Sequence, residues 1–262
     1  MKRVEIEEEL VDQAFLDAIT EAETKKQKKR GQVYVAKYYP NQPLPPPPTP
    51  GCRNILIHIS AKDFAGALSP FVLRNEQGQL LENVWQFSKL YKRVYAQKQL
   101  LYKKTPATSP LLWEHAAETH VDSSTGEPNE AYWAWRSKGM NNTFAVRYPN
   151  GFHGRKECVC ALWEGKRLDY IEARKQIYLG EYLRLAPKVP VFQQLCRMVN
   201  EEGTNVQLIE VDGPDPTLNY WPYEKGKSSM LMDEKKLEFL LNDKNRPFGH
   251  GFVLALMILT QK

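Results

Sequence analysis

Three polar side chains between Glu82 and Lys89 stand at a spacing that could assemble a site. Glu82, Gln86 and Lys89 are four and then three residues apart. On an α-helix such positions lie on one face, so a carboxylate, an amide and an ammonium would point in the same direction. Such a stripe can hold a polar ligand. The alternative interpretation is a charged pair on a helix surface that has no chemical role.

Aromatic and glycine residues elsewhere add candidate ligand contacts. Trp85 and Trp221 have flat faces on which a nucleobase or a nicotinamide-like ring could stack. The run Gly249 to Gly251 precedes a predicted helix, where backbone N–H groups can approach a phosphate. The alternatives are that both tryptophans belong to the core and that His250 is only a turn residue.

Several short segments, taken in order, resemble the NADAR family. The sharpest match is Glu82-Asn83-Val84-Trp85-Gln86-Phe87-Ser88-Lys89, which is similar to the family's Glu-His-x-x-Gln-x-x-Lys helix. The other similar segments are Leu68-Ser69-Pro70-Phe71, Arg167 to Arg174, Phe192 to Leu195, Glu210 to Asp215 with Tyr220-Trp221, and Pro247 to Gly251. The resemblance covers about residues 64 to 260 and is interrupted at 105 to 160.

This resemblance implies an enzyme that hydrolyses the N-glycosidic bond of an ADP-ribose conjugate without a metal or cofactor. The expected substrate is ADP-ribose attached to guanine bases in DNA. Two alternatives are a ribosylamino intermediate of riboflavin metabolism and a non-catalytic module that binds ADP-ribose or nucleic acid. A third is a scaffold protein. The implied catalytic residues are Glu82, Lys89, Asp212 and Asp215, and the implied ligand-binding residues are Ser69, Phe71, Trp85, Gln86, Trp221, Gly249, His250 and Gly251. Arg155 lies in the interruption and is a candidate ligand contact by its residue type alone.

These residue types suit the chemistry of breaking a ribose C1–N bond. Positive charge develops on the ring, so a fixed carboxylate must lie nearby and a second group must protonate the leaving nitrogen. Glu82 is the candidate for the ionised carboxylate. Asp212 or Asp215 would supply the second carboxyl group, and Lys89 would set the protonation of Glu82 or contact a phosphate.

The insertion at about 105–160 carries arginines among aromatic residues. Arg136, Arg147 and Arg155 are interleaved with Trp133, Trp135 and Tyr148. This mixture favours contacts with the phosphates of a polynucleotide over a purely solvated surface. A structureless run of this length is improbable, so we expect the insertion to contain short helices or strands.

Metal binding is not expected from the histidines and cysteines. His115 and His120 lie close to Asp122, but a third firm ligand is missing. The four cysteines are too few and too irregular for a disulfide scaffold or a zinc site, so we expect reduced thiols.

The elements that would position these residues predict a mainly helical α+β domain with a small β component. Helices are expected at 4–24, 82–102, 169–186 and 190–201, with a further helix after Gly251. Strands are expected at 32–39 and 54–60. We divide the chain into an N-terminal extension, 1–51, and one catalytic domain, 52–262.

The extension contains two features of its own. The basic run 25–30 could contact nucleic acid or direct nuclear import, but a solvated helix end is the simpler interpretation. Residues 40–51 are rich in proline, which excludes helix and sheet and predicts an extended strap. This strap could dock an SH3-type partner.

Composition and charge bound the class of protein. Of the 262 residues, 42% are hydrophobic and 26% are charged, which is ordinary for a globular protein. The longest apolar run is too short to span a bilayer and the chain starts without a secretory signal, so an intracellular location, cytoplasmic or nuclear, is expected. The net charge of +5 is compatible with a phosphate-bearing ligand.

Overall fold

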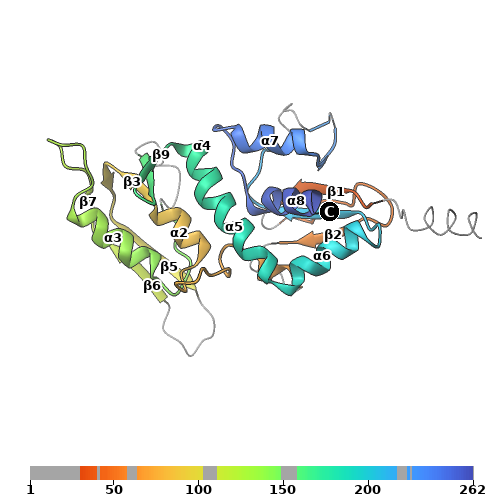
Figure 1. Cartoon of the computed structure of the whole chain (residues 1–262), viewed down its shortest axis with the longest axis horizontal. Helices are drawn as coiled ribbons and strands as arrows, with labels where there is room; N and C mark the ends of the chain where they lie inside the picture. Colours follow the sequence, from red (N-terminus) through yellow and green to blue (C-terminus); the bar gives the residue numbers. More distant parts are fainter. Residues whose placement is uncertain are drawn as a thin grey trace, which may run out of the picture.

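A computed structural model describes residues 30–39, 42–57, 64–102, 111–148, 158–216, 223–224 and 226–261. Within these ranges the chain mixes helices and strands (Figure 1), as predicted. The β component is larger than expected, because the described residues form one four-stranded, one three-stranded and two two-stranded sheets. The predicted helix at 4–24 lies outside the described residues.

The four-stranded sheet has the order β11, β1, β10, β2, formed by Ser229–Leu231, Val33–Lys37, Val206–Glu210 and Arg53–Leu56. β10 pairs in parallel with β1 and β2, and β11 adds to β1 in the antiparallel direction. β1 and β10 are buried over nearly their whole length, as parallel strands covered on both faces must be, although β10 includes the polar residues Gln207 and Glu210. The predicted strands at 32–39 and from Asn54 are confirmed, but 58–60 lie outside the described residues.

Helices pack on this sheet and form its core. α8 (His250–Thr260) packs against β1 and β10, and α6 (Pro190–Asn200) packs against α8.

The predicted helix at 169–186 is confirmed as α4 (Tyr170–Ala173), a π-helical stretch (Arg174–Leu179) and α5 (Gly180–Leu185). Asp169 caps its start by accepting the backbone N–H of Glu172. α7 (Glu234–Asn242) also packs on α8. We call the apolar core of this region the aliphatic cluster, after its most frequent side chains. Val35, Leu208 and Leu254 belong to it, together with some aromatic residues such as Phe192.

The predicted helix at 82–102 is wrong beyond its first two turns. α2 spans Leu81–Phe87 only, and β3 (Lys89–Tyr91), β4 (Arg93–Val94) and β5 (Gln97–Tyr102) follow. Ser88 ends the helix, because its hydroxyl donates to the Trp85 carbonyl and its own carbonyl accepts the Leu162 N–H of β8 (Cys158–Trp163). Tyrosine and valine after Ser88 favour strands, which outweighs the apparent helical spacing.

The insertion contains regular elements, as predicted: β6 (Leu111–His115), β7 (Glu118–Thr119), α3 (Glu130–Met140) and the start of β8. β8 lies between β3 and β9 (Lys166–Leu168), while β5 pairs with β6 and β4 with β7. Figure 1 shows these elements at the opposite end of the molecule from β1, β2 and α6. Their core, which we call the aromatic cluster, consists of Phe87, Leu90, Tyr91, Val94, Trp113, Tyr132, Trp135, Met140, Val146 and Tyr148.

The proline-rich segment forms neither helix nor strand over its described residues, 42–51, as predicted. It is fixed to the large sheet through its carbonyl oxygens: Gln207 donates to Pro45 and Pro46, and Asn54 donates to Pro45. We call residues 42–51 the proline strap. None of the helices in the described ranges has the length and apolar content needed to cross a lipid bilayer.

Candidate active site

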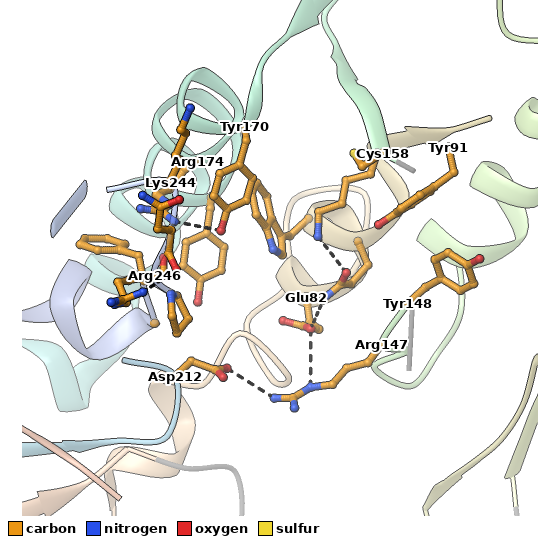
Figure 2. Close-up of a pocket in the computed structure, with 18 residues that line it drawn as sticks. Glu82, Tyr91, Arg147, Tyr148, Cys158, Tyr170, Arg174, Asp212, Lys244 and Arg246 are labelled. Atoms are coloured by element: carbon orange, nitrogen blue, oxygen red, sulfur yellow. Dashed lines mark hydrogen bonds and ion pairs between the residues drawn. The ribbon is translucent and has the colours of Figure 1, made fainter. Parts of the chain in front are cut away.

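A pocket of about 440 Å³ opens between the two clusters. α2 supplies one wall, the π-helical stretch a second, and the segment before α8 a third (Figure 2). Its lining residues are Glu82, Trp85, Gln86, Lys89, Tyr91, Arg147, Tyr148, Cys158, Tyr170, Arg174, Tyr178, Asp212 and 244–249. Four of the residues predicted from the Glu82 to Lys89 segment therefore line one cavity together with Asp212.

Glu82 is a buried carboxylate that borders the pocket. Its residue is only 7% exposed, which excludes the surface ion pair considered as the alternative. Gln86 donates a hydrogen bond of 2.8 Å to its Oε1 atom. Burial raises the pKa of Glu82, and Gln86, Arg147 and Lys89 oppose that rise. A carboxyl group in this state can hold a proton at a pH where an exposed one has lost it.

Lys89 reaches the same pocket although it belongs to β3 and not to a helix. Its Nζ donates to Gln86 Oε1 at 2.9 Å, so ammonium, amide and carboxylate form a chain. The ammonium also lies 4.3 Å from the centre of the Trp85 ring, which is a cation–π contact. The predicted convergence of Glu82, Gln86 and Lys89 is therefore found, with a different element carrying Lys89.

Arg147 connects two carboxylates across the pocket. Its Nε lies 3.9 Å from Glu82 Oε1, and another guanidinium nitrogen lies 3.7 Å from Asp212 Oδ2 (Figure 2). The guanidinium also packs over Phe71, at 5.0 Å from the ring centre. Asn83 holds the chain beside Arg147, because its amide accepts the Val146 N–H and donates to two carbonyls. Arg147 thus contacts carboxylates, whereas the sequence predicts a phosphate contact.

Asp212 lies on a loop that two charged residues, the buried Glu210 and the partly buried Lys37, hold in place. Glu210 Oε1 accepts the Asp212 N–H at 2.8 Å, and Lys37 donates to the carbonyls of Val211 and Gly213. Asp212 lines the pocket and Asp215 does not. Asp215 instead interacts with Tyr39, where burial and then this carboxylate raise the pKa of the hydroxyl to about 12.

The glycines before α8 serve a close approach within the protein. A Cβ atom on Gly249 would meet the Glu210 carboxylate at about 2.3 Å. The N–H of Gly251 donates to Glu210 Oε2, and the N–H of Gly249 donates to the Asp212 carbonyl. His250 contacts the Ile57 carbonyl and Glu210. These two N–H groups already have acceptors, so the geometry does not support the predicted phosphate contact at this turn.

Aromatic side chains form the wall opposite Asp212. Trp85 makes tilted contacts with Tyr178 and Tyr170, in addition to its contact with the Lys89 ammonium. Arg174 lies behind Tyr170 and is 1% exposed. Tyr170, Arg174 and Tyr178 were not expected in the site from the sequence, but their spacing of four residues on one predicted helix face was a usable signal.

The remaining predicted residues fall in three places. Ser69 is buried, its hydroxyl accepts the Phe71 N–H, and neither residue lines the pocket. Arg155 and Trp221 lie outside the described residues. His115 and His120 are near the aromatic cluster, and the described ranges contain no group of three residues suited to a metal ion.

Comparisons with known proteins add no relative. The chain matches no protein family, no curated protein and no solved structure.

Proposed function

We propose that this protein is an N-glycosidase that hydrolyses the ribose C1–N bond of a nucleotide conjugate, with ADP-ribose on guanine as the first substrate to test. The observation that carries the proposal is Glu82: a buried carboxyl group with a raised pKa that borders a polar pocket. Ionisable groups in clefts whose pKa is shifted by burial and by nearby charges are typical of catalytic sites. The resemblance of residues 82–89 to the NADAR helix supports the same assignment.

The environments of the two carboxyl groups support different roles. Glu82 is buried and holds its proton more tightly, so it would protonate the leaving nitrogen as the C1–N bond breaks. Asp212 is more than half exposed at its side chain and would take the proton of the water that attacks C1. This assignment is the reverse of the one expected from the sequence, in which Glu82 is the ionised partner. Arg147 would keep both groups oriented toward one point.

Cationic side chains on the pocket wall suit the phosphates of such a substrate. Lys244 and Arg246 line the pocket opposite Lys89, in the segment that precedes α8. ADP-ribose carries two phosphates, which guanidinium and ammonium groups bind well. The insertion supports a polynucleotide substrate less than expected, because Arg147 contacts carboxylates and Arg136 donates to the Leu162 carbonyl.

The test is single-turnover cleavage of ADP-ribosylated guanine DNA by the Glu82→Gln variant under saturating enzyme. Glutamine keeps the shape but cannot donate the proton, so we expect the rate to fall by about 10²–10⁴-fold while ligand binding persists. Glu114→Gln, which changes an exposed glutamate on β6, is the matched control and should cleave at the wild-type rate. Mass spectrometry of the products identifies the bond that is broken.

The pH profile distinguishes the two roles of Glu82. If Glu82 acts as the acid, the wild-type rate should decline as pH rises through its raised pKa, because the protonated form is lost. A rate that instead increases over that interval would assign Glu82 to the ionised role. Binding of ADP-ribose with no cleavage of any conjugate would contradict the glycosidase proposal and favour a binding module.

A further inference from the structure

Tyr170 combines exposure with an unusual degree of fixation. Its ring lines the pocket and the residue is 45% exposed. An exposed tyrosine ordinarily directs its hydroxyl into water, but here Arg174 donates to the hydroxyl at 2.9 Å. Figure 2 shows this contact at the edge of the pocket. The ring is therefore held in one orientation while one part of it stays open to the cavity.

Arg174 is well suited to hold the ring because it is itself immobile. One of its terminal nitrogens donates to the carbonyls of Leu240, Leu241 and Asp243, and the other donates to Arg246 as well as to Tyr170. Its guanidinium also packs 4.7 Å from the centre of the Tyr170 ring. A guanidinium with this many partners at 1% exposure cannot change its position without breaking several hydrogen bonds.

The same guanidinium fixes a backbone segment that contributes a second cation to the pocket wall. Because Arg174 binds the carbonyls of Asp243 and Arg246, it fixes the backbone on both sides of Lys244, whose exposed side chain also lines the pocket.

Trp85 is a poorer stacking surface than Tyr170, since Lys89 covers the Trp85 ring at 4.3 Å and Tyr178 contacts it at 5.4 Å. The Tyr170 ring has Arg174 at 4.7 Å and Trp85 at 6.2 Å, yet the residue stays 45% exposed, whereas Trp85 is partly buried.

We propose that Tyr170 is the stacking platform for the purine ring of a nucleotide ligand, with Lys244 attracting the phosphate of the same nucleotide. This inference rests on the proposed function, because it assigns a place in that pocket to the adenosine part of an ADP-ribose-like substrate. An aromatic ring that is fixed before binding loses little conformational entropy when a base stacks on it. Base stacking on an aromatic side chain contributes about 1–3 kcal/mol.

The test compares binding of three probes, namely ADP-ribose, AMP and ribose 5-phosphate, by titration calorimetry. Tyr170→Leu should weaken AMP and ADP-ribose by about 5- to 150-fold, since each 1.4 kcal/mol corresponds to tenfold, and should leave ribose 5-phosphate unchanged. Tyr95→Leu is the matched control: Tyr95 is also 45% exposed and also packs against an arginine, Arg93, but it does not line the pocket. It should bind all probes like the wild type.

A second variant separates loss of stacking from loss of folding. Tyr170→Trp keeps a flat ring, so it should bind AMP as tightly as the wild type or more tightly. The proposal is overturned if the wild type does not bind AMP, if a folded Tyr170→Leu binds AMP normally, or if Tyr170→Trp is folded but weak. It is also overturned if Tyr170→Leu weakens ribose 5-phosphate equally.

The two proposals can fail separately. If AMP binding depends on Tyr170 but no conjugate is cleaved, the stacking site stands and the glycosidase proposal fails. If conjugates are cleaved with the same KM by wild type and Tyr170→Leu, the glycosidase stands and the stacking site fails.

Discussion

The aliphatic and aromatic clusters differ in how completely their polar atoms are satisfied. In the aliphatic cluster, the buried polar groups Gln207 and Glu210 each make several hydrogen bonds. In the aromatic cluster, the indole nitrogens of Trp113 and Trp135 are buried without a hydrogen-bond partner among the described residues. An unsatisfied buried donor costs about 1–3 kcal/mol. We therefore expect the aromatic side to be the less stable of the two.

This difference matters because the pocket depends on both sides. α2 packs Leu81 into the aliphatic cluster and Phe87 into the aromatic cluster, so it connects them within two turns. Glu82 lies between these anchors, Asp212 comes from the aliphatic side, and Arg147 follows the helix of the aromatic side. The geometry of the site is therefore only as stable as the less stable side.

The largest expected effect on stability comes from cutting the connection between the two sides. Asn83→Ala removes three hydrogen bonds to the segment 142–146 and leaves the buried Val146 N–H without its acceptor. We expect a loss of about 3 kcal/mol or more in the free energy of unfolding, measured by urea denaturation. Asn200→Ala, which loses only an exposed contact with Arg30, is the control. An equally small loss in both variants would show that the Asn83 hydrogen bonds contribute little to holding α2 on the aromatic side.

A pair of glycine substitutions compares packing on the two sides. A Cβ atom on Gly139 of α3 would lie about 2.1 Å from the buried Phe87 ring, so Gly139→Ala should destabilise the protein by about 1–3 kcal/mol. Gly180→Ala on α5 meets nothing closer than 3.6 Å and should stabilise by about 0.5–1 kcal/mol, because alanine favours helix. Thermal denaturation measures both. If Gly139→Ala is neutral, the aromatic cluster repacks more readily than its contacts indicate.

The smallest expected effect is a difference in acid sensitivity. His120 is fully buried, and burial lowers its pKa although Glu118 opposes this. In mild acid the unfolded chain takes up a proton on His120 before the folded protein does. The stability that depends on neutral His120 is therefore fully present above the unfolded-state pKa, and it is lost as pH falls through the lowered folded-state pKa. Mild acid should therefore raise hydrogen exchange in α3 before it does so in β1 and β10. His120→Gln should remove that difference. Simultaneous exchange on both sides in the wild type would contradict it.

The spacing of apolar residues correctly predicted the elements that pack against the rest of the protein through a single surface. The helices from Asp169 and from Pro190 are found nearly as expected because each packs one apolar face into the core, and β1 is found as a strand that is buried on both faces. The segment after Phe87 was predicted incorrectly because Leu90, Tyr91 and Val94 fit either period, and the choice of strand depends on β8, about seventy residues later. The sequence around Phe87 alone does not reveal that this segment pairs with β8.

The same limit applies to the site. Glu82 and Gln86 could be singled out because residue type and spacing already carry their chemistry, whereas the resemblance suggested Asp212 and Asp215 together and did not distinguish them. Arg147 was singled out, but its partners were not, because they come from two distant segments. Tyr170 and Arg174 needed the segment 240–246 before their arrangement had a meaning.

The proline strap sets a condition on any partner that would recognise it. Pro46 to Pro48 are exposed, so their outward sides are accessible to a polyproline-binding domain. The carbonyls of Pro45 and Pro46, however, are acceptors for Gln207, which is fully buried in β10. A partner that needs these carbonyls must detach the strap and leave the amide with fewer acceptors, at a cost of about 1–3 kcal/mol. Recognition of the strap would then compete with the folding of the large sheet, and its affinity would increase whenever that sheet is weakened.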